Sequence, residues 1–141
     1  FFTRAGIAYE IPQDIRREMW WKFMMNVGIN QISSILGANY GIFQKKKEAR
    51  ELVKDACFEV LAIAQKKNIA LSESDIDGFF PIIDGLSPQG KTSMLQDIEE
   101  GRKTEVELFS KTVIALGKEL GIKTPVNDLL YKMIKVLENK T

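Results

Sequence analysis

Three polar side chains recur at helical spacing in an otherwise apolar stretch of the chain. Lys22, Asn26 and Asn30 are four residues apart, so a helix carrying them places them in one slowly drifting stripe. Two amides and an ammonium suit a small polar or anionic ligand, and burial would lower the lysine pKa from about 10.4 so that it could give up a proton. The spacing by itself favours a structural interpretation, in which both amides join helices while Lys22 reaches solvent past Trp20 and Trp21.

Two further polar residues stand where helices are predicted to begin. Ser93, with Gln96 three residues later, has the form of a capping box, and Glu105 lies in the first turn of a helix predicted from Thr104. Helix-start residues need no function to explain them. The free N–H groups of a helix N-terminus nevertheless also bind carboxylates.

The segment from Gly85 to Thr92 matches the phosphate-loop pattern GxxxxGK[ST], and an apolar run precedes it. A phosphate loop presents consecutive backbone N–H groups, but Pro88 has none, and Pro81 would interrupt the strand that must precede the loop. The alternating strands of such a sheet are also missing from the sequence. We therefore interpret the match as a coincidence rather than as the mark of a nucleotide triphosphatase.

The composition excludes several classes of chemistry. The 141 residues suit one globular domain, and the absence of histidine removes Ser-His-Asp, Cys-His and HExxH sites, so no metal site is expected. A lone Cys57 excludes an intrachain disulfide and fits a reducing compartment such as the cytoplasm. A net charge of +1 argues against a nucleic-acid partner. Polar residues interrupt the longest uncharged stretch, 23–44, so no membrane span is expected.

The pattern of apolar residues predicts an all-α fold. A long helix from Ile15 to Leu36 is apolar on most sides and should be central, with a stop at residues 37–41. The other predicted helices cover residues 45–68, 76–80, 93–101, 104–120 and 125–137, with Gly121 as a C-terminal stop and Thr124-Pro125 as the start of the last. Leu129, Leu130, Met133, Ile134 and Leu137 form the apolar side of that last helix.

Three spaced motifs together resemble the C-terminal domain of the ketopantoate reductase (2-dehydropantoate 2-reductase) family. They are Trp20-x-Lys22-x-x-x-Asn26-x-x-x-Asn30, then Ser93-Met94-x-x-Asp97-x-x-x-Gly101-Arg102-x-Thr104-Glu105, then Gly121-Ile122-x-Thr124-Pro125. The resemblance spans nearly the whole chain. It implies a single helical domain over residues 1–141, similar to the C-terminal domain of the 6-phosphogluconate dehydrogenase superfamily, in a protein whose N-terminal Rossmann domain binds NADPH.

The chain contains no GxGxxG after a strand, so we expect the Rossmann domain to be absent from it. The chain begins with Phe1 and shows no signal-peptide pattern, which indicates a piece of a longer protein. The resemblance makes residues 1–14 the end of the interdomain connection. The isolated domain is then expected to be inactive, because the catalytic cleft would lie between the two domains.

Carried over residue by residue, the resemblance implies a role for each polar group. Lys22 matches the general acid that protonates the carbonyl oxygen as hydride arrives from the nicotinamide. Asn26 and Asn30 match residues that hold the substrate's hydroxyl, carbonyl and carboxylate, and Ser93 matches a residue that bonds the carboxylate. Glu105 matches an acidic residue near the cofactor and the substrate hydroxyl, where it would also hold Lys22 charged.

One position departs from the family pattern. The family often carries a substrate-contacting Asn directly before the glycine that ends the first helical region, whereas here Tyr40 precedes Gly41. Asn39 either replaces that donor through a different turn or is a turn residue without substrate contact. The resemblance thus implies reduction of ketopantoate to pantoate, in pantothenate biosynthesis, and leaves the preferred 2-oxo acid open.

A second hypothesis assigns the chain to interaction rather than catalysis. Large apolar side chains crowd residues 19–25 of the first helix: Met19, Trp20, Trp21, Phe23, Met24 and Met25. Such a surface is typical of a helical dimerisation module, here in a reductase that acts on a different 2-oxo acid. The two hypotheses are compatible, because one homodimer could carry both properties.

Overall fold

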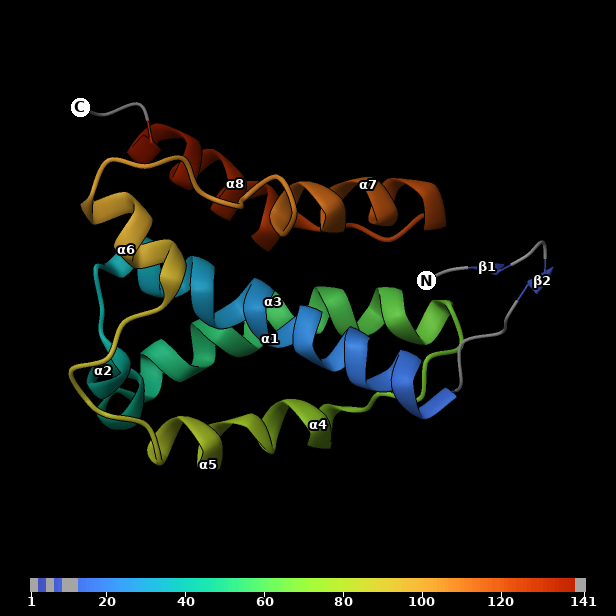
Figure 1. Cartoon of the computed structure of the whole chain (residues 1–141), viewed down its shortest axis with the longest axis horizontal. Coiled ribbons are helices and arrows are strands. Elements are labelled where there is room, and N and C mark those ends of the chain that lie inside the picture. Colours follow the sequence, from blue (N-terminus) through green and yellow to red (C-terminus); the bar gives the residue numbers. More distant parts are fainter. Residues whose placement is uncertain (1–2, 5–6, 9–12, 139–141) are drawn as a thin grey trace.

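The computed structural model describes residues 3–4, 7–8 and 13–138, and its body is helical (Figure 1). The helices are α1 (Gln13–Leu36), α2 (Tyr40–Lys45), α3 (Lys47–Lys66), α4 (Glu73–Asp77), α5 (Phe79–Asp84), α6 (Ser93–Glu99), α7 (Ser110–Leu120) and α8 (Pro125–Glu138). Two strands of two residues each, β1 (Thr3–Arg4) and β2 (Ile7–Ala8), form an antiparallel hairpin that the sequence did not predict. The predicted all-α class is confirmed. Most of the predicted interdomain connection at residues 1–14 lies outside the described residues.

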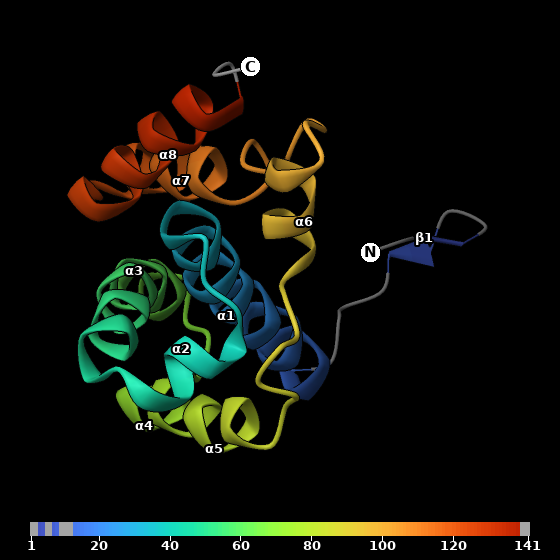
Figure 2. The same ribbon diagram turned by 90° about the vertical axis from the view of Figure 1, so that its left-hand side faces the viewer.

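Helix α1 lies in the middle of the domain, as its apolar composition predicted. It packs against α3, α6 and α8, and Met24 and Val27 are fully buried. The paired helices α7 and α8 cover one side of the α1–α3 pair, and the short helices α4 and α5 lie on the opposite side (Figure 2). One 24-residue helix therefore spans the domain and offers its remaining face to solvent.

Helices α1 and α3 approach each other closely at Gly28. A Cβ atom added there would lie 2.7 Å from the Cys57 sulfur and 2.9 Å from a methyl carbon of Val53. The Cys57 thiol donates a hydrogen bond to the Met24 carbonyl at 3.3 Å. Burial raises the pKa of Cys57 to about 12, so this thiol stays protonated.

A buried polar network joins four helices. The Ser110 hydroxyl donates to the Gln31 side-chain oxygen, and the Gln31 amide donates to Asn127 at 3.4 Å. Asn127 in turn donates to Glu59 at 2.7 Å. The Glu59 carboxylate also accepts the backbone N–H groups of Val126 and Asn127 at 2.8 and 2.9 Å, so a side chain of α3 satisfies the first turn of α8.

Several predicted boundaries differ from the structure. Helix α7 begins at Ser110 rather than Thr104, because the Thr104 N–H and hydroxyl both donate to Glu138 of α8 and residues 105–109 form turns. The predicted stop at residues 37–41 contains the start of α2, and the single short helix predicted near 76–80 is two helices that meet at Gly78. Both differences concern helices of five or six residues, α2, α4 and α5. Helices this short contain too few turns for the spacing of apolar residues to define their ends.

Other predicted signals are confirmed. Gly121 ends α7 with φ of +74°, in the left-handed region that favours glycine, and α8 begins at Pro125 directly after Thr124. The apolar side predicted for α8 is only partly buried. Leu130 and Ile134 are in the core, whereas Leu129 and Met133 are exposed.

The segment from Gly85 to Thr92 is a connector between α5 and α6. The apolar run 79–83, which a phosphate loop would need as a strand, lies in the helix α5. The carbonyls of Pro88 and Gly90 accept the N–H groups of Gly41 and Tyr40, both at 2.9 Å. The segment therefore binds the start of α2, and its context is not that of a phosphate loop. None of the described helices is long and apolar enough to span a membrane.

The contact at Gly28 leads to a stability prediction. In Gly28→Ala the new methyl group meets buried atoms of α3, and such overpacking costs about 1–3 kcal/mol. The higher helix propensity of alanine over glycine offsets at most about 1 kcal/mol of this cost. We expect the free energy of unfolding, measured by urea denaturation followed by circular dichroism, to fall.

Gly85→Ala is the matched control, because Gly85 has φ of −86° and its nearest neighbouring atom would be 3.5 Å from the new Cβ. The control should unfold like the wild type. Equal stability of Gly28→Ala and wild type would show that α1 and α3 can separate at no cost.

Candidate active site

The stripe formed by Lys22, Asn26 and Asn30 lies on the solvent-facing side of α1. Lys22 and Asn26 are exposed, and Asn30 is half-buried. Among the described residues, neither asparagine side chain makes a hydrogen bond to another helix, so the part of the structural interpretation in which both amides join helices is wrong. Lys22 does reach solvent, as that interpretation predicted. The amides are therefore available to a ligand or to another part of the protein.

Lys22 has an ion-pair partner that the sequence analysis overlooked. Its Nζ lies 3.5 Å from Glu18 Oε1 on the preceding turn, and both side chains are about two-thirds exposed, at 67% and 66%. A Glu four residues before a Lys is a known stabilising pair on helices, so the spacing could have revealed it. In water such a pair is weak, but it places a carboxylate beside the ammonium.

Ser93 is brought close to the Asn30 end of the stripe. The Asn30 carbonyl accepts the Ser33 hydroxyl at 3.0 Å, and the Ser33 oxygen lies 2.6 Å from the Thr92 hydroxyl. Because the Ser33 proton is used on Asn30, Thr92 is the donor in the second bond. This chain of bonds fixes the start of α6 against α1, directly before Ser93.

The predicted capping box at Ser93 is wrong. Thr92 is the N-cap of α6, and its hydroxyl oxygen accepts the Leu95 N–H at 3.2 Å. Ser93 is the first residue of the helix and its side chain is exposed. Since Thr92 caps the helix, the Ser93 hydroxyl is not needed for capping and is open to solvent beside the stripe.

Glu105 lies in the turns that precede α7, next to the anchored Thr104. The Glu138 side chain that holds Thr104 is only 7% exposed. Burial acts to raise the Glu138 pKa, but the bonds from Thr104 and Lys135 outweigh it and the pKa is lowered. Glu105 itself is exposed, and among the described residues no ion pair joins it to Lys22. Its predicted role at the cofactor therefore stays a prediction.

The loop that departs from the family pattern packs against the segment leading to Ser93. A Cβ added to Gly90 would lie 2.9 Å from the Tyr40 ring, so the ring covers that glycine. Burial raises the Tyr40 pKa. Asn39 occupies the N-cap position of α2 without a side-chain cap bond. Tyr40 thus has a packing role, whereas the half-buried Asn39 keeps both of its interpretations.

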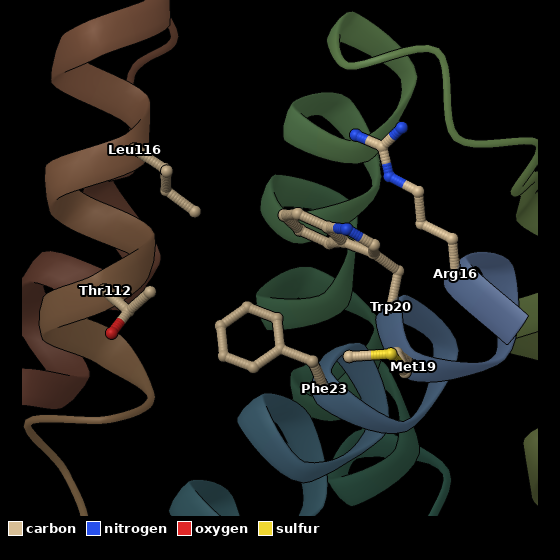
Figure 3. A pocket seen from close by; sticks show the side chains of 6 residues that line it. All are labelled: Arg16, Met19, Trp20, Phe23, Thr112 and Leu116. Atoms are coloured by element: carbon tan, nitrogen blue, oxygen red, sulfur yellow. The ribbon is translucent and has the colours of Figure 1, made fainter. Parts of the chain in front are cut away.

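A pocket of about 310 Å³ opens beside the stripe, and periodicity alone could not reveal it because two helices form it. Figure 3 shows its lining: Arg16, Met19, Trp20 and Phe23 from α1, with Thr112 and Leu116 from α7. The lining is mostly apolar. Met19, at 51% exposure, marks its open edge.

The arrangement suits binding and proton transfer to a small anion. The stripe and Ser93 supply an ammonium, two amides and a hydroxyl, which donate to carbonyl and carboxylate oxygens. Among the described residues, no group of three or more Cys, Asp and Glu side chains has the arrangement of a metal site.

The two hydroxyls at the start of α6 should have separable effects on stability. Thr92→Ala removes the cap and the bond to Ser33, so we expect the free energy of unfolding to fall by about 1–2 kcal/mol. Ser93→Ala, one residue away and exposed, should change it by less than about 0.5 kcal/mol. Thermal and urea denaturation of the two variants test this, and the reverse order would return the capping role to Ser93.

Comparison with known proteins identifies the family. The model of the C-terminal domain of ketopantoate reductase (PanE/ApbA) matches residues 14–138. A 2-dehydropantoate 2-reductase from Aquifex aeolicus (strain VF5) is 28% identical over 141 residues, which cover 97% of this chain and 45% of the relative.

Solved structures agree with the family match. A PanE/ApbA family ketopantoate reductase from Ralstonia eutropha JMP134 superposes with a TM-score of 0.79 at 25% identity, covering 96% of this chain and 45% of that one. D-mandelate dehydrogenase with NADH and anilino(oxo)acetate shares the fold, with a TM-score of 0.83 at 24% identity and coverage of 96% and 45%. The chain spans about half the length of these relatives. It belongs to the family of ketopantoate reductase C-terminal domains.

Proposed function

We propose that this chain is the substrate-binding and proton-donating part of a 2-dehydropantoate 2-reductase, which reduces ketopantoate to pantoate in pantothenate biosynthesis. The observation that carries the proposal is the open stripe of Lys22, Asn26 and Asn30 with Ser93 held at its end, in a chain of this family. The stripe offers donors and one acid, as reduction of a 2-oxo acid requires.

The proposal places the remaining half of the reductase over the exposed face of α1. We propose that it is a Rossmann domain that precedes this chain and binds NADPH, with the reaction in the cleft between the two. The NADH of the structurally similar D-mandelate dehydrogenase supports the nicotinamide class, and the choice of NADPH rests on the family resemblance. Glu105, exposed in the turns before α7, would accept a hydrogen bond from a hydroxyl of the cofactor or the substrate.

The chemistry assigned to this chain follows the charge that develops on the substrate. A reduced nicotinamide, when bound, supplies the hydride to the carbonyl carbon. The carbonyl oxygen then gains negative charge, and Lys22 stabilises that charge and donates a proton to the oxygen. Asn26 and Asn30 orient the substrate's oxygens, and Ser93 donates to the carboxylate. In this scheme the substrate's carboxylate is bound by neutral donors, and the positive charge of Lys22 acts on the carbonyl oxygen that is reduced.

Glu18 adds a positioning element to this scheme. Its carboxylate lies one helical turn before Lys22, on the side away from Asn26 and Asn30, and attracts the ammonium at that end of the stripe. In the isolated chain water screens the pair. Covering this face by the rest of the protein would exclude water and strengthen the attraction.

The test is nicotinamide oxidation by the full-length reductase with ketopantoate. We expect Lys22→Ala to lower kcat by about 100- to 10,000-fold, the range typical of general acids. Lys22→Arg should be similarly impaired, because a guanidinium keeps the charge but does not release a proton at working pH.

Lys66→Ala is the matched control, since Lys66 is an exposed helical lysine in the last turn of α3. Its kcat should equal that of the wild type. Turnover of Lys22→Ala within a factor of about two of the wild type would remove Lys22 as the proton donor. Absence of turnover by the wild type with every 2-oxo acid would overturn the reaction itself.

We also propose that the protein forms a homodimer, through a different surface from the one that the sequence suggested. Met24 and Met25 of the crowded segment are buried in the core, at 0% and 3% exposure. A group of exposed apolar side chains instead lines a groove of about 280 Å³ between α1, α3 and α8: Leu36, Leu52, Leu129 and Met133. A neighbour with this fold is described as a dimeric ketopantoate reductase from Staphylococcus aureus, with a TM-score of 0.81.

Light scattering of the full-length protein tests the dimer. The double substitution Leu129→Glu and Met133→Glu puts two charges on the apolar groove, and we expect it to convert a dimer into a monomer. Leu108→Glu is the control, since Leu108 is 60% exposed and does not line the groove. A wild type that is monomeric at high concentration, or a double variant that stays dimeric, would overturn the proposal.

A further inference from the structure

We infer that the pocket between α1 and α7 receives the apolar substituent of the 2-oxo acid and thereby sets how large that substituent can be. The inference rests on the proposed function and adds a specificity site to it. The substrate's two polar ends would lie on the stripe, and its carbon side chain would lie in the pocket.

The pocket and the stripe are neighbours on one helix. Met19 lies three residues before Lys22, and Phe23 lies three residues before Asn26. Residues three apart on a helix have Cβ atoms about 5–6 Å apart. A ligand bound to Lys22 and Asn26 therefore lies within reach of Met19 and Phe23, which line the pocket.

The pocket has an aromatic wall on α1, formed by Trp20 and Phe23, and an aliphatic side chain, Leu116, opposite it on α7. The Trp20 and Phe23 rings meet edge to face, with centroids 5.7 Å apart and planes at 88°. Both rings project from α1 toward α7, and Leu116 projects back toward them (Figure 3). A volume of about 310 Å³ is at the small end of ligand pockets, which fits part of a metabolite rather than a whole cofactor.

The lining selects the chemistry of the occupant. Arg16 is the only charged residue of the lining, and it lies six residues before Lys22, which is about 9 Å along the helix axis. The part of the pocket that adjoins the stripe is formed by Met19 and Phe23, which carry no charge. Burial of an aliphatic or aromatic substituent is favoured there, and a charged substituent would lose hydration without a partner.

A series of 2-oxo acids tests the inference on the full-length enzyme. The probes are pyruvate, 2-oxobutanoate, 3-methyl-2-oxobutanoate, phenylpyruvate and ketopantoate; the first four differ in the size of an apolar substituent, and ketopantoate adds a hydroxyl to a branched one. In Leu116→Trp the larger side chain occupies the pocket from α7, on the side away from Lys22. We expect kcat/KM for the branched and aromatic acids to fall by about 10- to 100-fold, while that for pyruvate stays within about twofold.

Met19→Ala provides the opposite change at an exposed position, where loss of the fold is not a concern. It widens the open edge of the pocket, and the ratio of kcat/KM for phenylpyruvate over pyruvate should rise. Leu108→Trp is the control, because it adds the same ring on an exposed residue that does not line the pocket. Its selectivity should equal that of the wild type.

The outcomes separate this inference from the proposed function. Equal losses for pyruvate and for the large acids in Leu116→Trp would mean that the pocket serves packing between domains, and the inference would be overturned while the reductase activity stood. Unchanged selectivity in both pocket variants would overturn it in the same way. A wild type without turnover on any of the five acids would remove the proposed function first, and the pocket assignment with it.

Discussion

Helix α1 packs so closely against α3 at Gly28 that no side chain fits between them, and the other elements are arranged around this pair. The close approach brings the buried faces of both helices into contact, with Val53 and Cys57 on one side and Met24 and Val27 on the other. Because α1 is then buried against α3, α6 and α8, the exposed polar side chains of the stripe lie on its remaining, solvent-facing side. The candidate site occupies that face, so the geometry of the core decides where the site is.

Buried hydrogen bonds place the elements that hydrophobic packing alone would leave free to slide. Glu59 fixes the start of α8, Ser33 fixes the start of α6, and Glu138 fixes the turns before α7. Each bond satisfies groups at a helix start or in a turn, and leaving such groups unsatisfied in the interior would be costly. Ser93 and Glu105 each follow directly after an anchored residue. The positions of Ser93 and Glu105 therefore depend on Ser33 and Glu138, which lie outside the candidate site.

The stripe is exposed to water in this chain, and that bears on its chemistry. An ammonium paired with a carboxylate at 3.5 Å in water gains little from the pair. The same groups interact more strongly once the surrounding dielectric falls. The pocket alongside adds a mostly apolar surface. A domain seated on this face would exclude water from the stripe.

The sequence determined the features that depend on neighbours along the chain. The spacing of Lys22, Asn26 and Asn30 places them in one stripe on any α-helix, and Gly121 ends α7 because the left-handed conformation suits glycine. The central position of α1 followed from its apolar composition. The family resemblance carried by the spaced motifs was likewise available from the sequence, and the family match confirms it.

Tertiary structure decided everything that depends on residues far apart in the chain. Thr92, rather than Ser93, caps α6 because the Ser33 hydroxyl on α1 meets it there, and α7 starts late because Glu138, which is 34 residues away, binds Thr104. The pocket at Phe23 and Leu116 exists only where α1 and α7 meet. The spacing of apolar residues describes one helix at a time. Caps, anchoring bonds and pockets depend on residues of other helices, which that spacing does not identify.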